Sequence, residues 1–279
     1  MGDMKYTIKN LHTEFPSDDA CLDFIFKHKY PDAKGYSRMS GRKAYANSQG
    51  HHIHPLAGTI FEKSKTPLSV WFHVMFLFAS HKNGVSAKTI QRETGVTYKT
   101  AWRMGHQIRK LMEQGGDLLS GEVEADETYY GKGGTNSSKF KNKQAVLGAV
   151  ERKGRIRAKA APNRRAEIVL PFIKENVERG SFMVTDEYRG YDKLSFGAYG
   201  YQHVNVKHGK KRYSWKGQHT NTIEGFWGQF KRSVRGTYSF VSSQHLQAYL
   251  NEFAWRYNER NSSVPAFALL LARASQWLS

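Results

Sequence analysis

The sequence predicts an α/β (α+β) fold, a mixed sheet with flanking helices, and two observations lead to that prediction. From Glu122 apolar and polar residues alternate with a period of two, and similar short segments follow at 145–150, 155–160 and 181–188. Between the segments at 155–160 and 181–188, residues 163–178 have apolar side chains at helical spacing. The resulting order of strand, hairpin, helix, strand and helix is expected of one mixed sheet covered by helices.

The composition indicates a folded protein with a polyanionic partner. The chain has 279 residues, a formal net charge of +19 and a pI near 9.9, while 39% of its residues are hydrophobic and 13% aromatic. Such a charge favours nucleic acid, and the apolar content argues against a disordered basic tail. Cys21 is the single cysteine, and no apolar run approaches the ~18 residues of a membrane span. We therefore expect no disulfide framework, no membrane partner and a cytoplasmic, nucleoid-associated protein.

Three segments are predicted along the chain: an N-terminal ribbon-like segment (1–62), a helical region (63–116), and the sheet with C-terminal helices (117–279). The first segment contains the cluster His51-His52-Ile53-His54. Adjacent histidines on an extended segment point to opposite faces, so a metal site there is the weaker of two interpretations.

Residues 84–104 have the spacing of a helix-turn-helix. One short helix should end at Gly95 and the next should start after Thr97, with Tyr98, Lys99 and Arg103 available to a DNA groove. Many helix pairs share this pattern without touching DNA. With the net charge considered, contact with DNA is the favoured interpretation.

Carboxylates gather on the predicted sheet. Glu122, Glu124 and Asp126 alternate along one face of the first strand, where they repel one another unless cations share them. Asp186 stands at the end of the hydrophobic strand that begins at 181, where a carboxylate is either a loop cap or a ligand.

A further carboxylate, Glu224, lies on a predicted helix at 220–232 whose apolar stripe contains Ile223, Phe226, Trp227 and Phe230. Glu224 is the only acidic residue between Lys193 and Asn251, a tract with many cations. Two interpretations stay open. Glu224 is a metal ligand placed where nucleic acid arrives, or it forms a capping box with Asn221 as the N-cap. The cations suit a polyphosphate, and the predicted DNA contacts among them are Lys210, Lys211, Arg212, Lys231, Arg232 and Arg235.

A carboxylate on the first strand, another after a later strand and a third on a helix describe a mixed sheet of the ribonuclease H type. Phosphoryl transfer there uses two divalent ions about 4 Å apart. Oxygen ligands suit Mg²⁺ or Mn²⁺, and a chain with one cysteine cannot build a thiolate zinc site.

Three motifs together resemble the DDE transposases of bacterial insertion sequences, in the group with an N-terminal zinc ribbon. They are Glu124-Ala125-Asp126-Glu127-Thr128-Tyr129, Thr185-Asp186-Glu187-Tyr188-Arg189-Gly190-Tyr191 and His219-Thr220-Asn221-Thr222-Ile223-Glu224-Gly225-Phe226-Trp227. Residues 58–64 and 98–104 are also similar to that group, and the resemblance runs from about Phe15 to Arg260.

The resemblance implies specific roles. Asp126, Asp186 and Glu224 match the catalytic, metal-binding triad, and Lys231 matches a basic residue that contacts DNA near the cleaved end. His219 and Asn221 share the motif of Glu224 and are candidates to assist the triad. Glu127 and Glu187 follow the two aspartates, and we interpret them as structural or supporting residues.

One departure concerns the ribbon. Where the group has two Cys-x-x-Cys pairs, this chain has Tyr36 with Met39 and Ala46 with Gln49. Thiolate ligation is impossible there, so we expect no zinc, and the module must fold by packing, use histidines or be degenerate.

The resemblance implies a DNA transposase, a Mg²⁺-dependent enzyme that binds terminal inverted repeats of double-stranded DNA, cleaves them and joins the 3′ hydroxyl to target DNA. Pairing two ends implies at least a homodimer. Two alternatives stay open: a non-catalytic DNA-binding protein, from a domesticated or decayed copy, and a structure-specific nuclease of the ribonuclease H type.

Overall fold

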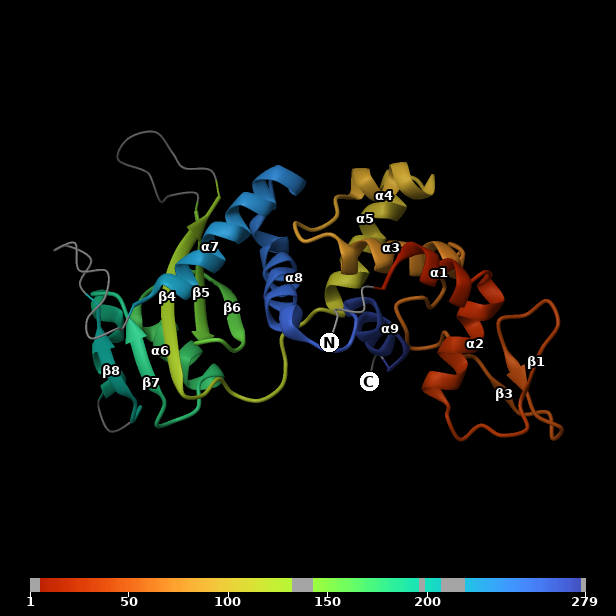
Figure 1. The fold of residues 1–279 in the computed structure, drawn as a ribbon, viewed down its shortest axis with the longest axis horizontal. Coiled ribbons are helices and arrows are strands. Elements are labelled where there is room, and N and C mark those ends of the chain that lie inside the picture. The colour runs from red at the N-terminus through yellow and green to blue at the C-terminus, as the bar shows by residue number, and fades with distance from the viewer. Residues whose placement is uncertain (1–5, 132–142, 196–198, 207–218, 277–279) are drawn as a thin grey trace. The chain divides into compact units, whose positions relative to one another are not determined.

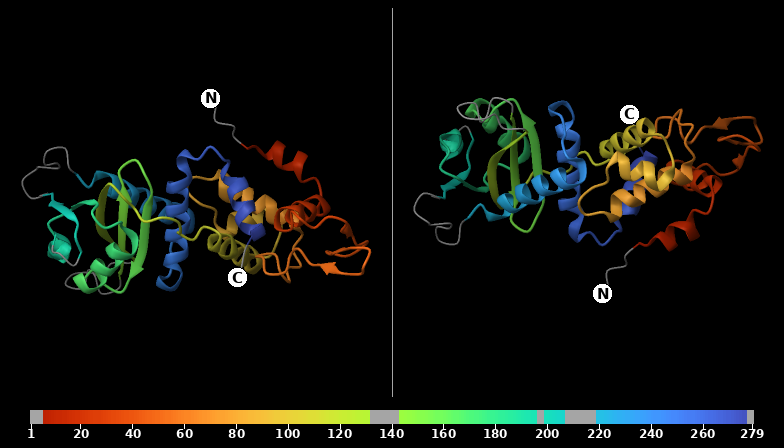
Figure 2. Two further views of the ribbon diagram at one scale, coloured as in Figure 1. Left: turned by 90° about the horizontal axis from the view of Figure 1, so that it is seen from below. Right: turned by 90° about the horizontal axis from the view of Figure 1, so that it is seen from above.

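The computed structural model describes residues 6–131, 143–195, 199–206 and 219–276. The chain forms two compact units, Met1–Met112 with Asn261–Ser279, which we call the helical unit, and Glu113–Arg260, which we call the sheet unit. Figures 1 and 2 show the elements of both units. None of the described helices is long and apolar enough to cross a membrane.

The helical unit combines helices with one small antiparallel sheet of strand order β1-β2-β3. Its elements are α1 (Ile8–Glu14), α2 (Asp18–Lys29), β1 (Ser37–Arg38), β2 (Tyr45–Ala46), β3 (His52–Ile53), α3 (Leu68–Ser80), α4 (Ala87–Thr94), α5 (Tyr98–Lys110) and α9 (Ala266–Gln276). The last helix packs on α2 and α3, where the Phe267 ring lies 6.4 Å from that of Phe72.

A carboxylate from another helix caps the start of α3. The backbone N–H groups of Leu68 and Ser69 donate to the two Asp18 oxygens at 3.0 and 2.9 Å. The helix begins at Leu68, and its N-cap Pro67 makes no side-chain capping hydrogen bond. Asp18 supplies the acceptors that the first turn needs.

The small β1–β3 sheet is held to α2 by aromatic packing and polar contacts. Tyr45 is buried and stacks on Phe26 of α2, with ring centroids 3.8 Å apart and planes within 5°. Its hydroxyl also donates to Asp23, and Lys29 reaches the backbone oxygens of Pro55 and Ala57. These contacts hold the small sheet and the loop that follows it against α2.

The sheet unit is built on a five-stranded mixed sheet of order β6-β5-β4-β7-β8, as predicted for a ribonuclease H-like fold. Strand β5 pairs antiparallel with both β4 and β6, whereas β7 pairs parallel with β4 and β8 pairs parallel with β7. The elements are β4 (Glu122–Tyr130), β5 (Gln144–Glu151), β6 (Ile156–Ala161), α6 (Ala166–Asn176), β7 (Phe182–Thr185), a 3-10 helix (Arg189–Ser195), β8 (Gln202–Asn205), α7 (Asn221–Ser233), a π-helical turn (Val234–Tyr238) and α8 (Leu246–Asn258).

Each face of this sheet carries its own apolar core. On one face α6 and the 3-10 helix cover Val123 and Ala125, and on the other α7 and α8 cover Val146 and Val150. Figure 2 shows α6 and the α7–α8 pair on opposite sides of the strands. The even-numbered residues of β4 therefore face α7, which decides where their carboxylates lie.

Pro171 lies inside α6 and does not interrupt it. The helix begins at Ala166, so the lost backbone donor falls near its first turns, and buried side chains on both sides of the proline hold the helix to the sheet. Tertiary packing therefore outweighs the local cost of the proline.

Candidate functional site

The first two carboxylates of the predicted triad stand on neighbouring strands. Asp126 lies in the middle of β4, on the face covered by α7. In the parallel pair of β4 and β7, Glu124 is opposite Val184. Asp126 follows Glu124 by two residues, and Asp186 follows Val184 by two, so the two carboxylates occur at the same level. Asp186 accepts a hydrogen bond from the Tyr188 backbone N–H at 2.9 Å, which shapes the turn after β7.

The helix α7 crosses this level directly over the sheet (Figure 1). Its Trp227 indole donates a hydrogen bond to Asp126 Oδ2 at 3.1 Å. The indole comes this close because its neighbour on β5 is Gly148, which pairs with Asp126. A Cβ at Gly148 would lie 2.5 Å from the Trp227 ring and 2.9 Å from the Ile223 side chain. The close packing of α7 on Gly148 therefore also places the indole donor beside Asp126.

Glu224 lies in the first turn of α7 and does not form a capping box. The helix begins at Asn221, so its N-cap is Thr220, whose side chain makes no capping hydrogen bond. The Thr220 hydroxyl instead donates to Glu224 Oε1 at 2.7 Å. The capping-box interpretation is therefore wrong, because Asn221 is already helical and Glu224 follows the cap by four residues rather than three.

The acceptor that caps α7 is Glu124, a role that sequence reasoning missed. Its Oε2 accepts from the backbone N–H groups of Thr222 and Ile223 at 2.9 and 3.1 Å, and its Oε1 accepts from the Thr222 hydroxyl at 2.7 Å. The side chain has 0% exposure. A buried carboxylate on β4 thus holds the end of the helix that carries Glu224.

A cation of the chain compensates the carboxylates at this end of β4. Arg152 Nη1 lies 2.8 Å from Glu122 Oε1, and its Nε donates to Glu124 at 3.2 Å. Its Nη2 donates to the backbone oxygen of His219, whose Nδ1 lies 3.4 Å from Glu124. His219 and Asn221 therefore lie at the capped start of α7.

Asp126 differs from Glu124 in its charge balance. Burial, and after it the negative charges of Glu127, Asp186 and Glu224, raise the pKa of the Asp126 carboxyl to about 7. The charges of the other two carboxylates of the predicted triad therefore reach Asp126. At neutral pH a large fraction of Asp126 is protonated.

The two glutamates that follow the aspartates lie outside the triad. Glu127 points to the opposite face of β4, where Arg164 Nη1 lies 2.6 Å from its carboxylate and Tyr191 donates to it at 2.9 Å. Glu187 is exposed to solvent. Glu127 nevertheless acts on the site through its charge, since it contributes to the raised pKa of Asp126.

Cations follow Glu224 along α7. Lys231 donates to the buried Thr128 hydroxyl on β4, while Arg232 and Arg235 are exposed. Burial lowers the pKa of Lys231, and the Asp126 carboxylate opposes that change, which places the ammonium beside the carboxylates. The other predicted contacts in this tract, Lys210, Lys211 and Arg212, lie outside the described residues.

In the helical unit, α4 and α5 meet at a tight turn. Gly95 ends α4 with a φ of 72°, and the Thr97 side chain accepts from the Thr100 N–H to cap α5. The outer face of α5 exposes the predicted residues Tyr98, Lys99 and Arg103. It also exposes Trp102, which sequence reasoning missed although it lies one helical turn after Tyr98.

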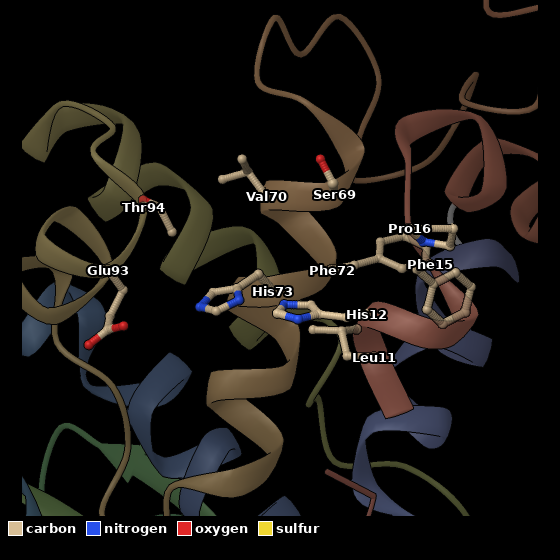
Figure 3. A pocket seen from close by; sticks show the side chains of 10 residues that line it. All are labelled: Leu11, His12, Phe15, Pro16, Ser69, Val70, Phe72, His73, Glu93 and Thr94. Atoms are coloured by element: carbon tan, nitrogen blue, oxygen red, sulfur yellow. The ribbon is translucent and has the colours of Figure 1, made fainter. Parts of the chain in front are cut away.

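A pocket of about 480 Å³ in the helical unit is lined by Leu11, His12, Phe15, Pro16, Ser69, Val70, Phe72, His73, Glu93 and Thr94 (Figure 3). Burial lowers the pKa of His73, and the nearby Glu93 opposes that change. His73 is therefore neutral at pH 7, and its surroundings are those of a half-buried imidazole in an aromatic core.

The donors around Asp126 fit a hard divalent cation chemically. They are carboxylate oxygens under mutual repulsion, and a bound cation would relieve the repulsion that raises the pKa of Asp126. Within the described part of the chain, no three His, Cys, Asp or Glu side chains are arranged to hold one ion. The carboxylates would therefore have to rotate toward a common point to share one.

Comparisons with known proteins assign most of the sheet unit to a family. Residues 118–258 match the family model described as ISXO2-like transposase domain. An uncharacterized transposase-like protein of Haemophilus influenzae is 30% identical over 103 residues, which are 37% of this chain and 79% of that protein. A protein in transposable element ISH50 of Halobacterium salinarum is 26% identical over 222 residues, with 71% of this chain and 72% of that protein covered.

A solved structure also aligns, with a low TM-score of 0.34 and 12% identity. It is a chain in the cryo-EM structure of the simian T-cell lymphotropic virus intasome in complex with PP2A regulatory subunit B56 gamma, and the alignment covers 68% of this chain and 69% of that one.

Proposed function

Since the chain belongs to the family of ISXO2-like transposases, we propose that it is a DNA transposase that cleaves the ends of an insertion sequence and joins them to target DNA. One observation carries the catalytic part. Asp126 on β4 and Asp186 after β7 lie at the same level of the sheet, and α7, whose first turn carries Glu224, donates its Trp227 indole N–H to the half-buried Asp126. Burial and the negative charges of neighbouring carboxylates, Asp186 and Glu224 among them, raise the pKa of Asp126, and strongly shifted pKa values of this kind are common at functional sites.

Asp126, Asp186 and Glu224 would hold Mg²⁺ or Mn²⁺, because hard divalent cations prefer oxygen ligands. Bound ions of this kind activate an attacking oxygen and stabilise a leaving one in phosphoryl transfer. The residues themselves set the geometry. Glu124 holds the start of α7, the helix whose first turn carries Glu224, and Trp227 orients one oxygen of Asp126.

The reaction that these residues would support has two steps. In the first, a water oxygen forms a bond to phosphorus at the end of the element, and the 3′ oxygen leaves with a proton as a hydroxyl group. In the second, that hydroxyl attacks a phosphodiester of the target, whose own 3′ oxygen departs. Lys231 beside Asp126 would bind a phosphate next to the broken bond.

Two cationic surfaces would bind the double-stranded DNA. The exposed Tyr98, Lys99 and Arg103 of α5 form a face suited to a groove and its phosphates, and we assign terminal-repeat recognition to it. Arg232 and Arg235 extend the second surface from Lys231 along α7. Joining two ends to one target further calls for at least two copies of the chain.

The deciding experiment is metal-dependent cutting of a terminal-repeat duplex in vitro. We expect Asp126→Asn, Asp186→Asn and Glu224→Gln each to lower the rate by on the order of 10³-fold or more while duplex binding is kept. Glu187→Gln, a change in an exposed neighbour of Asp186, is the matched control and should cut normally. Binding by the wild-type protein without any Mg²⁺- or Mn²⁺-dependent cutting would instead identify a non-catalytic DNA-binding protein.

A further inference from the structure

A second pocket lies in the sheet unit, where β4 ends. It measures about 630 Å³ and is lined by Tyr129, Tyr130, Gly131, Lys231, Arg235, Ser239 and Phe240. This volume is within the range of small-molecule and nucleotide sites. Of the described residues that line it, three are aromatic, two are cationic and none is acidic. The chemistry is that of an aromatic platform beside phosphate-binding cations.

A strained turn presents one of the aromatic side chains to solvent. Phe240 is 52% exposed, and the residue before it, Ser239, has a φ of 61° and a ψ of −51°. The Phe240 N–H donates to Tyr238 O at 2.6 Å, and the Val241 N–H donates to the Tyr130 hydroxyl at 3.0 Å. A non-glycine residue at positive φ persists only where its surroundings determine it. The exposed ring is thus held in place.

The preceding π-helical turn, Val234–Tyr238, is anchored in the same way. The Tyr238 hydroxyl donates to the Glu252 carboxylate at 3.0 and 3.1 Å, and Glu252 is fully buried. Arg256 completes this group with an ion pair to Glu252 at 2.8 Å. Turns of this kind occur often at functional sites, and here the turn brings Phe240 back toward the end of β4.

The rings and cations of the pocket are arranged for a flat ligand with an anionic group. Phe240 and Tyr130 have planes within 23° of each other and centroids 6.5 Å apart, so two faces of similar orientation are available. Lys231 reaches Thr128 on the same face of β4 as Asp126. Tyr130 follows Asp126 by four residues, about 13 Å along the strand, which is close to the rise of four stacked base pairs.

We propose that this pocket binds an unpaired nucleotide of the DNA strand that is being processed, with its base stacked on Phe240 and its phosphate on Lys231 and Arg235. The proposal rests on the proposed function, because it places the nucleotide on the DNA that Asp126 would act on. Bases inside a duplex are stacked on one another and cannot reach the ring. The pocket therefore selects for DNA whose end is frayed or extended as a single strand, and stacking makes it tolerant of sequence.

The test compares two labelled duplexes by fluorescence anisotropy, one blunt and one with single-stranded thymidines at its 3′ ends. We expect the wild-type chain to prefer the extended duplex and Phe240→Ala to lose about tenfold in affinity for it, with little change for the blunt duplex. Phe240→Tyr, which restores a ring, should bind as the wild type does. Leu118→Ala is the matched control, because Leu118 is also an exposed apolar side chain, at 44% against 52% for Phe240, and it precedes the other end of β4.

Salt dependence separates stacking from charge. Phe240→Ala should leave the slope of log affinity against log salt unchanged, whereas Arg235→Gln should reduce it by about one. An equal loss on both duplexes, or no loss for Phe240→Ala in a variant that melts like the wild type, would overturn the proposal. Metal-dependent cutting of a blunt cognate end by the wild-type chain would in either case leave the proposed transposase activity standing.

Discussion

Glu124 and Asp126 stand two residues apart on the same face of β4, yet their surroundings are opposite. The Glu124 carboxylate accepts from two backbone N–H groups and a hydroxyl, and Arg152 lies beside it. Asp126 receives the Trp227 indole N–H but is surrounded by the negative charges of Glu127, Asp186 and Glu224. A buried carboxylate with donors on every side builds structure, whereas one surrounded by other carboxylates lowers stability and is suited to bind a cation.

The largest expected effect comes from replacing Glu124, the carboxylate that is surrounded by donors. Glu124→Ala should destabilise the protein by about 3–5 kcal/mol, because it leaves two backbone N–H groups at the start of α7 and the Thr222 hydroxyl without their acceptor and removes one of the two carboxylates beside Arg152. Urea denaturation followed by tryptophan fluorescence measures it. Asp126→Ala on the same strand face serves as the comparison, and an equal loss of stability for both variants would erase the distinction between the two carboxylates.

A second change acts on the contact between α7 and the sheet. Gly148→Ala would push its Cβ into the Trp227 ring, so it should cost up to about 3 kcal/mol and displace the indole from Asp126. Thermal unfolding gives the cost, and near-ultraviolet circular dichroism follows the indole. Gly225→Ala on the exposed face of α7, where a Cβ meets open space, is the matched control and should be tolerated.

Neutralising Asp126 should increase the stability of the protein. The pKa of Asp126 is raised from 3.8 to about 7 in the folded protein, so the folded state binds more protons than the unfolded state between these values. The free energy of unfolding of the metal-free protein should therefore fall as pH rises from about 4 to 7. Asp126→Asn should remove this loss and stabilise the protein by on the order of 2 kcal/mol at pH 8.

Thermal melts of wild type and Asp126→Asn at pH 4 and pH 8, in chelator, measure that difference, which should be small at the lower pH. Adding Mg²⁺ or Mn²⁺ at pH 8 should raise the melting temperature of the wild type and not that of the variant. A variant that is equally stabilised at both pH values would show that packing, rather than charge, caused the gain.

The smallest effect concerns the single hydrogen bond that orients Asp126. Trp227→Phe keeps an aromatic ring over Gly148 but removes the donor, so it should cost about 1 kcal/mol. It should also raise the pKa of Asp126 further, since an indole N–H stabilises the charged form. Titration of the Asp126 carboxyl by nuclear magnetic resonance would detect that shift, and an unchanged pKa would contradict it.

Local patterns were sufficient for much of the fold. The alternation in β4, the hairpin of β5 and β6, and the apolar stripe of Ile223, Trp227 and Phe230 all predicted elements that the structure contains. Patterns failed where a distant group replaces a local one. Asn221 was one predicted local cap for α7, but the acceptor comes from Glu124, and Asp18 caps α3 in the same way from far away in the sequence.

The sequence by itself determined the alternating carboxylates of the first strand, the lone acid in a basic tract and the surplus of cations, because these follow from residue order alone. Only the tertiary structure decided which carboxylate is structural. Glu124 and Asp126 have the same periodicity, but their surroundings differ. Arg152 and the start of α7 contact Glu124, whereas Asp186 after β7 and Glu224 in the first turn of α7 bring negative charge toward Asp126. An electrostatic environment depends on distances in space, and a strand pattern does not contain them.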